Sequence, residues 1–126
     1  MIIDANFEGL KQIKNGDYVF EGNLESKENI EIHLNDRFVI RGSITTEKSI
    51  IAECGIEAGE GIKAGCGIEA GEGIKAGWGI EAGFRIFAGT SVYRSSKNCI
   101  KTISCKRLIK GEIAFGQLIE RGEKDG

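Results

Sequence analysis

Large apolar residues recur at every sixth position through the middle of the chain. From Gly55 onward the sequence reads GIEAGE, GIKAGC, GIEAGE, GIKAGW, GIEAGF and RIFAGT. The large apolar slot is filled at Ile32, Phe38, Ile44, Ile50, Ile56, Ile62, Ile68, Ile74, Ile80, Ile86 and Val92. A period held over so many units is typical of a repeat architecture, in which each unit buries its apolar side against its neighbours.

The spacing inside each hexad predicts a short strand. A second apolar slot lies two residues after the first and holds Leu34, Ile40, Thr46 and then alanine from Ala52 to Ala88. Residues i and i+2 of a strand point to the same side, so each hexad supplies two inward residues and one outward residue. A helix is disfavoured because two glycines per hexad would cost about 2 kcal/mol per repeat. We therefore expect an all-β protein, a β-solenoid whose equivalent strands stack about 4.8 Å apart.

The charges in the outward slot predict how many hexads make one coil. This slot reads Glu57, Lys63, Glu69, Lys75 and Glu81. A coil of two hexads would stack like charges, whereas a coil of three hexads stacks glutamate on lysine. Opposite charges one rung apart stabilise a sheet by a few tenths of a kcal/mol, and like charges destabilise it by about as much. The sequence therefore predicts a three-sided coil of about 18 residues.

The segment before the repeat has the pattern of a short helix. Its apolar residues lie on one helical face: Phe7, Leu10 and Ile13. Asp4 is suited to cap the start of a helix, and Asn15-Gly16 is suited to end it. We predict that residues 4–16 form a helical cap over the first coil.

One domain is expected to comprise the whole chain, residues 1–126. The solenoid is predicted over residues 18–92, a closing segment over 93–120 and a frayed tail over 121–126. Within the closing segment, residues 99–109 and 112–119 have the composition of strands. They are compatible with a final coil or with a closing hairpin.

Composition limits the classes of partner. The 126 residues include 17 Lys and Arg against 19 Asp and Glu, a net charge of −2, so direct nucleic-acid binding is not expected. No apolar run approaches the roughly 18 residues of a membrane span, and no secretory signal precedes the repeat. Four cysteines without a CxxC pair are typical of free thiols in a reducing compartment. We expect a cytoplasmic protein without a metal site.

No motif for catalysis is present. The chain lacks a nucleophile elbow, a phosphate-binding loop and a zinc motif, so we predict no enzyme activity, no catalytic residue and no cofactor. His33 falls between Ile32 and Leu34 and is interpreted as a solvent-facing strand residue. Hexapeptide acyltransferases place a small residue two positions before the large aliphatic one. Here that position includes Glu60 and Trp78, so this activity is not expected.

Aromatic residues interrupt the polar exterior within a short stretch. In a coil of 18 residues, Phe84 would stack above Cys66 and Phe87 above Glu69. Two interpretations are open: the closing segment covers these aromatics, or they form an exposed surface that binds a partner or a second copy. The candidate protein-binding surface comprises Trp78, Phe84, Arg85, Phe87, Tyr93 and Arg94.

Two resemblances bear on function. The segments EGNLESKENIEI and RGSITTEKSIIAE resemble bactofilins, bacterial cytoskeletal proteins with a three-sided β-helix that polymerise. The segment GIKAGWGIEAGFRIFAG and the ending GEIAFGQLIE resemble glycine-rich hexad-repeat proteins of Firmicutes and of their phages and mobile elements. The second resemblance implies a non-catalytic binding protein, for example a phage or mobile-element inhibitor of a host defence complex such as an anti-CRISPR. The first implies a self-assembling scaffold, and either role allows a homodimer.

Overall fold

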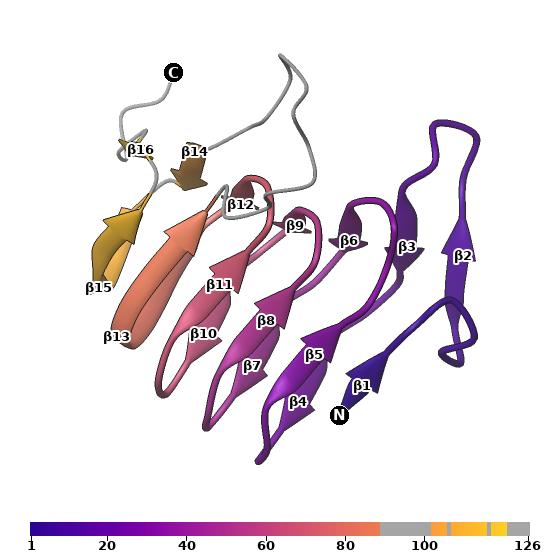
Figure 1. Cartoon of the computed structure of the whole chain (residues 1–126), viewed down its shortest axis with the longest axis horizontal. Helices are drawn as coiled ribbons and strands as arrows, with labels where there is room; N and C mark the ends of the chain where they lie inside the picture. Colours follow the sequence, from indigo (N-terminus) through magenta and orange to yellow (C-terminus); the bar gives the residue numbers. More distant parts are fainter. Residues whose placement is uncertain (89–101, 106, 116, 121–126) are drawn as a thin grey trace.

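The protein is all β in the part of the chain that the structure describes. A computed structural model describes residues 1–88, 102–105, 107–115 and 117–120 (Figure 1). These residues contain no helix, and therefore none long and apolar enough to cross a membrane. The strands are β1 (Ile2–Ile3), β2 (Leu10–Gln12), β3 (Tyr18–Phe20), β4 (Leu24–Ser26), β5 (Ile30–Ile32), β6 (Phe38–Ile40), β7 (Ile44–Thr46), β8 (Ile50–Ala52), β9 (Ile56–Ala58), β10 (Ile62–Ala64), β11 (Ile68–Ala70), β12 (Ile74–Ala76), β13 (Gly79–Ala88), β14 (Thr102–Cys105), β15 (Arg107–Phe115) and β16 (Gln117–Glu120).

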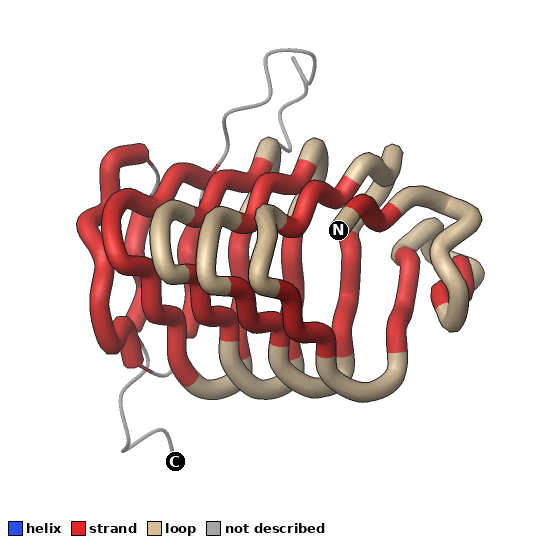
Figure 2. The backbone as a smooth tube through the Cα atoms, turned by 90° about the horizontal axis from the view of Figure 1, so that it is seen from below, coloured by secondary structure: helices blue, strands red, loops and turns tan. Residues whose placement is uncertain are grey.

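The strands wind into a β-solenoid of about 4 turns, and Figure 2 shows its coils lying side by side. Strands of successive coils pair in parallel. Phe38 pairs with Ile56, Ile56 with Ile74, and Ile62 with Ile80. Because large apolar residues pair with large apolar residues, the repeat of the sequence becomes columns of apolar side chains.

Two hydrogen-bonded sheets contain all the described strands. One sheet has the order β16-β14-β12-β9-β6-β3-β2. The other has the order β1-β5-β8-β11-β13-β10-β7-β4, and β15 also pairs with its strand β13. The long strand β13 belongs to two stacks, since Ile80 pairs with Ile62 of β10 and Ile86 pairs with Ile68 of β11. A corner between these two stacks therefore lies inside β13, around Gly83.

The core is a set of isoleucine and alanine columns. Ile44, Ile80 and Ile86 are 0% exposed, as are Ala76 and Ala82. The strands β10, β11 and β12 alternate buried, exposed, buried, so the predicted inward and outward slots are confirmed here. Thr46 occupies an inward slot, and its hydroxyl donates a hydrogen bond to the carbonyl oxygen of Glu28.

The six-residue frame is wrong in the first coil. Ile30 pairs with Ile50, and Ile32 pairs with Ala52, so Ile32 occupies the small inward slot rather than the large one. The connection after β5 is longer than the later corners. Two side chains accept hydrogen bonds in this connection, Asn35 from the Tyr18 hydroxyl and Asp36 from the backbone N–H of Arg37.

The predicted helical cap at residues 4–16 is also wrong. This segment forms turns and strand β2, which pairs antiparallel with β3. Gly9 has φ of 87° and Gly16 has φ of 99°, a left-handed conformation that a right-handed helix does not contain. Phe7 nevertheless contacts Phe20, with ring centroids 5.9 Å apart. A turn-based cap therefore covers the first coil.

The described strands of the closing segment continue the coils and do not form a hairpin. Strands β14, β15 and β16 pair in parallel with β12, β13 and β14 respectively. Ile103 pairs with Ile74, the place predicted for Val92, which lies outside the described residues. The predicted gap between strands at residues 110–111 is wrong, because β15 continues through both residues, including Gly111 with φ of 135°.

Candidate partner-binding site

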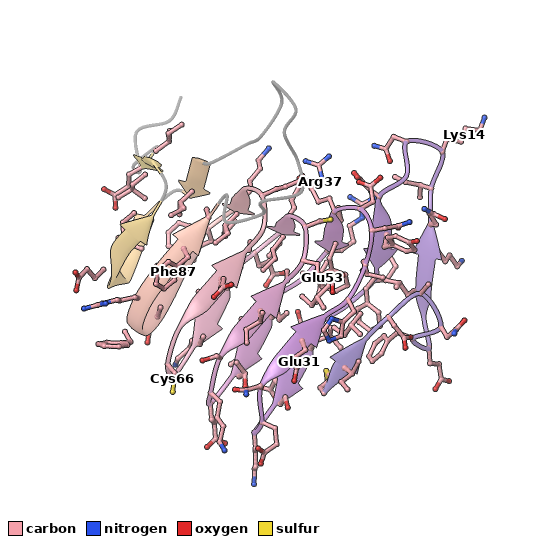
Figure 3. The ribbon with its side chains drawn as sticks, in the orientation of Figure 1. Lys14, Glu31, Arg37, Glu53, Cys66 and Phe87 are labelled. Carbon is pink, nitrogen blue, oxygen red and sulfur yellow. The ribbon has the colours of Figure 1, made fainter. Side chains whose placement is uncertain are left out.

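A shallow groove of about 300 Å³ lies on the outer side of the solenoid across β8, β11 and β13. Six side chains carry its chemistry, and we call it the aromatic groove: Ile51, Cys66, Glu69, Phe84, Arg85 and Phe87. Figure 3 shows Phe87 on β13, and Cys66 at the corner before β11. The groove therefore extends over three successive coils.

The parallel register determines which side chains form the floor of the groove. Ile51 pairs with Glu69, and Glu69 pairs with Phe87, so their side chains follow one another outward along adjacent strands. Ile51 is 38% exposed and Phe84 is 63% exposed, while Phe87 is half-buried. Exposed apolar side chains that line one groove of a polar surface are typical of an interaction site.

Arg85 lies at the rim of the groove. Its guanidinium carbon is 5.1 Å from the centre of the Phe84 ring, which is a cation–π arrangement. Each group restricts the other, so an aromatic ring and a positive charge are presented together. Aromatic residues and arginine are the residue types enriched where binding energy concentrates in protein interfaces.

Glu69 differs from Glu57 and Glu81, the outward glutamates two hexads before and after it. Glu57 forms an ion pair with Arg37 at 3.3 Å, and Glu81 forms one with Lys63 at 3.9 Å. Among the described residues no ion pair neutralises Glu69, which is exposed between Ile51 and Phe87. The floor of the aromatic groove thus carries one uncompensated negative charge.

The structure brings together only part of the predicted surface. Phe84, Arg85 and Phe87 lie in the aromatic groove, and Phe87 stacks on Glu69 as predicted. Trp78 is 47% exposed at a different corner, where its backbone N–H donates to Glu60. Tyr93 and Arg94 lie outside the described residues. Trp78 therefore does not line the aromatic groove.

Sequence reasoning missed Ile51. This residue occupies the outward slot between Ile50 and Ala52, where the following hexads carry a charge. Ile51 pairs with Glu69, and Glu69 pairs with Phe87 one coil further on. Comparison of outward slots three hexads apart would have identified it.

His33 lies in an acidic setting away from the aromatic groove. Its Nδ1 is 3.1 Å from the Glu53 carboxylate and its Nε2 is 3.3 Å from the Glu31 carboxylate. The hydrogen bond to Glu53 is the main cause that raises the pKa of His33 above its usual value. The ring is thereby favoured in its charged form, in which both nitrogens donate. No group of the described residues has the arrangement to hold a metal ion.

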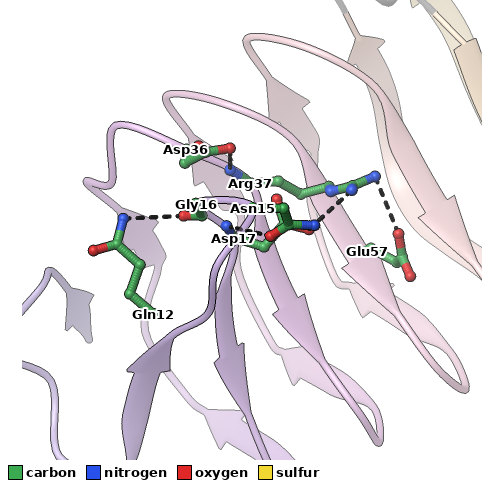
Figure 4. A network of polar contacts seen from close by, with 7 residues as sticks. All are labelled: Gln12, Asn15, Gly16, Asp17, Asp36, Arg37 and Glu57. Carbon is green, nitrogen blue, oxygen red and sulfur yellow. Dashed lines mark hydrogen bonds and ion pairs between the residues drawn. The ribbon is translucent and has the colours of Figure 1, made fainter.

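A second polar cluster ties three coils together (Figure 4). Arg37 donates to Asp17 at 2.9 Å and contacts Glu57 at 3.3 Å, so one guanidinium joins a carboxylate on each side. The Asp17 side chain is only 9% exposed, and it also accepts a hydrogen bond from Asn15. Hydrogen bonding to Asp17 raises the pKa of Arg37. This cluster is structural, because its polar atoms face one another.

We expect the Arg37→Gln variant to lose about 1–2 kcal/mol of unfolding free energy, because the largely buried Asp17 carboxylate loses its charged donor. The Lys48→Gln variant is the matched control. Its partner Glu28 is 70% exposed, so the loss should stay below about 0.5 kcal/mol. Urea denaturation followed by circular dichroism measures both values. Equal losses would contradict the structural role of Arg37.

A scan against models of protein families, a search of curated proteins and a search of solved structures each gave no match to this chain.

Proposed function

We propose that this chain is a non-catalytic binding protein that docks a protein partner in the aromatic groove. The observation that carries the proposal is the cluster of Ile51, Phe84 and Phe87, with Arg85 stacked on Phe84. These side chains share one exposed surface of a scaffold held by parallel strand pairing. Such a surface needs little reordering on binding, which favours affinity.

The shape of the groove favours a protein over a small molecule. Its volume of about 300 Å³ is at the lower end of small-molecule sites, and it is shallow rather than enclosed. One or two side chains of a partner would fill it. A partner of this kind requires no catalytic group, cofactor or metal from this chain.

The partner that we propose is a bacterial defence complex in the cytoplasm. This chain would act as a phage or mobile-element inhibitor, in the manner of an anti-CRISPR, by occupying a surface that the complex needs. The resemblance of GIKAGWGIEAGFRIFAG to hexad-repeat proteins of mobile elements supports this role. A small rigid surface without catalytic motifs is compatible with inhibition by occupancy.

We propose that the solenoid is three-sided, with three hexads in each coil. The offset of 18 residues between hydrogen-bonded glycine and serine positions supports this geometry. Further support comes from the two strands that separate β7 from its register partner β10. Trp78 and the aromatic groove would then lie at different corners of one triangular coil.

The proposal is tested by site-specific photocrosslinking in bacterial lysate. A benzoylphenylalanine at position 84 should capture a partner, whereas the same group at position 63, on β10, should not. The captured protein is then identified and purified, and calorimetry compares its binding to the wild-type chain and to Phe87→Ser. We expect binding at least about 10-fold weaker for Phe87→Ser. Identical capture at both positions, or unchanged affinity, would overturn the proposal.

A self-assembling scaffold is the second candidate, and the strand edges favour it. Among the described strands, β15 and β16 at one end and β1, β2 and β4 at the other have a partner on one side only. Unpaired edges allow chains to join end to end. Light scattering over a wide concentration range separates the candidates. Mass that grows without limit supports the scaffold, and a discrete monomer or dimer supports the binding protein.

A further inference from the structure

An ordered column of outward residues extends beyond the aromatic groove on the same stack of strands. The register pairs Ile2 with Glu31, Glu31 with Ile51, Ile51 with Glu69 and Glu69 with Phe87. We call this the striped column: Ile2, Glu31, Ile51, Glu69 and Phe87. Figure 3 labels Glu31 on β5 and Phe87 on β13, near the two ends of the column. Apolar and acidic side chains alternate along it.

The spacing of the striped column selects the secondary structure of an occupant. Adjacent rungs are about 4.8 Å apart, so Ile51 and Phe87 are separated by roughly 10 Å with Glu69 midway. A helix advances about 1.5 Å per residue, so its residues i and i+7 are also roughly 10 Å apart on one face. Its residues i+3 and i+4 lie between them on that face. Side chains on one side of an extended strand are about 6.8 Å apart, so they do not match the spacing between Ile51 and Phe87.

The charge of the striped column selects the chemistry of the occupant. Glu69 has no ion-pair partner among the described residues, and Glu31 is already engaged with His33. A lysine or arginine above Glu69 would neutralise the groove floor. A second copy docked column to column does not supply it, because the striped column contains no basic residue and the neighbouring Arg85 is stacked on Phe84. Face-to-face pairing of two copies would bring acidic groups together.

We propose that the partner inserts an amphipathic helix along the striped column, perpendicular to the strands. The helix carries apolar residues at i and i+7, which contact Ile51 and Phe87, and a lysine or arginine at i+3 or i+4, which pairs with Glu69. This inference rests on the proposed function and specifies the partner's element. Arg85 remains stacked on Phe84 at the rim and limits the opposite side of the groove.

A phage-displayed library of alanine-rich helical peptides tests this inference. Four positions are randomised, i, i+3, i+4 and i+7, and the library is selected on the purified wild-type chain. We expect apolar residues at i and i+7, and lysine or arginine at i+3 or i+4. Selected peptides should bind at least about 10-fold more weakly to Phe87→Ser and to Glu69→Lys. Selection on Glu69→Lys should instead enrich aspartate or glutamate.

A matched charge reversal serves as the control. Glu25 is an exposed outward residue on β4, outside the striped column, so Glu25→Lys should leave peptide binding unchanged. All variants should melt within a few degrees of the wild type, so that lost binding reports the site rather than unfolding.

Three outcomes would overturn the helix proposal. The library is not enriched on the wild-type chain relative to Phe87→Ser, the selected peptides lack a basic residue, or they bind Glu69→Lys as tightly as the wild type. The result remains separable from the proposed function. If the library fails while position 84 still captures a partner whose binding depends on Phe87, the partner is a protein but its element is not this helix. If both experiments fail, the aromatic groove is not a protein-binding site.

Discussion

The Ile68→Asp variant is expected not to fold. Ile68 is 1% exposed, and its register neighbours are Ile50 and Ile86, both 0% exposed. An aspartate here would place a carboxylate among aliphatic columns that offer no donor. Burying an unpaired charge costs many kcal/mol, whereas the total stability of a domain is about 5–15 kcal/mol. Circular dichroism and thermal melting should detect no cooperative transition.

The adjacent outward residue provides the control for this experiment. Glu69→Gln changes a side chain that is exposed and has no ion-pair partner among the described residues. Its unfolding free energy should therefore change by less than about 0.5 kcal/mol. A cooperative melt of Ile68→Asp near that of the wild type would contradict the column of buried isoleucines.

The second large effect is expected at one of the two glycines in the hexad. A Cβ built at Gly65 would overlap the carbonyl oxygen of Glu47 in the preceding coil. That atom belongs to the backbone, and the same corner holds a hydrogen bond from Gly65 N–H to Thr46 at 3.0 Å. Gly65→Ala would have to separate two coils, so we expect a loss of about 3 kcal/mol or more.

Gly61→Ala is the matched control, because it makes the same chemical change on the other side of β10. A Cβ at Gly61 would lie 3.5 Å from the nearest atom, an ordinary contact. We expect stability to stay the same or to rise by up to about 1 kcal/mol, since alanine restricts the unfolded chain. Urea midpoints measure both variants. Equal destabilisation would mean that the corners do not require close backbone approach at Gly65.

The regular part of the fold was predictable because a single pattern determines several features at once. From β8 to β13, the spacing of isoleucine and alanine specifies the strands and the buried slots, and the glycines mark the corners. The first coil was mispredicted because Ile30, Ile32 and Leu34 alternate in the same way. Either frame buries apolar side chains, and only the strand pairing distinguishes them.

The cap illustrates a different limit of pattern reasoning. The spacing of Phe7 and Leu10 is equally compatible with a helix and with two turns that cover the same apolar surface. Gly9 decides between them through its left-handed backbone, a property that side-chain periodicity does not report. Phe7 and Leu10 do pack against the core, although the segment does not have the predicted secondary structure.

The candidate site was predictable where residues depart from the repeat. Phe84 and Phe87 stand out because glycine-rich hexads with charged outward slots precede them. Ile51 was missed because it belongs to the less regular early repeats and becomes informative only beside its column neighbour Glu69. Trp78 departs from the repeat just as clearly, but it lies at another corner. Departures from the hexad repeat therefore identify exposed aromatic residues, but they do not show which of these residues share a surface.

The constant register between successive coils gives the molecule a modular length. Because β7, β10 and β13 pair residue for residue, duplication of one complete coil would add a layer whose upper and lower surfaces fit those already present. Insertion between β8 and β11 would move Ile51 one layer further from Phe87 and leave the fold intact. The spacing between surface residues can thus change in evolution by one coil at a time, while the core keeps its packing.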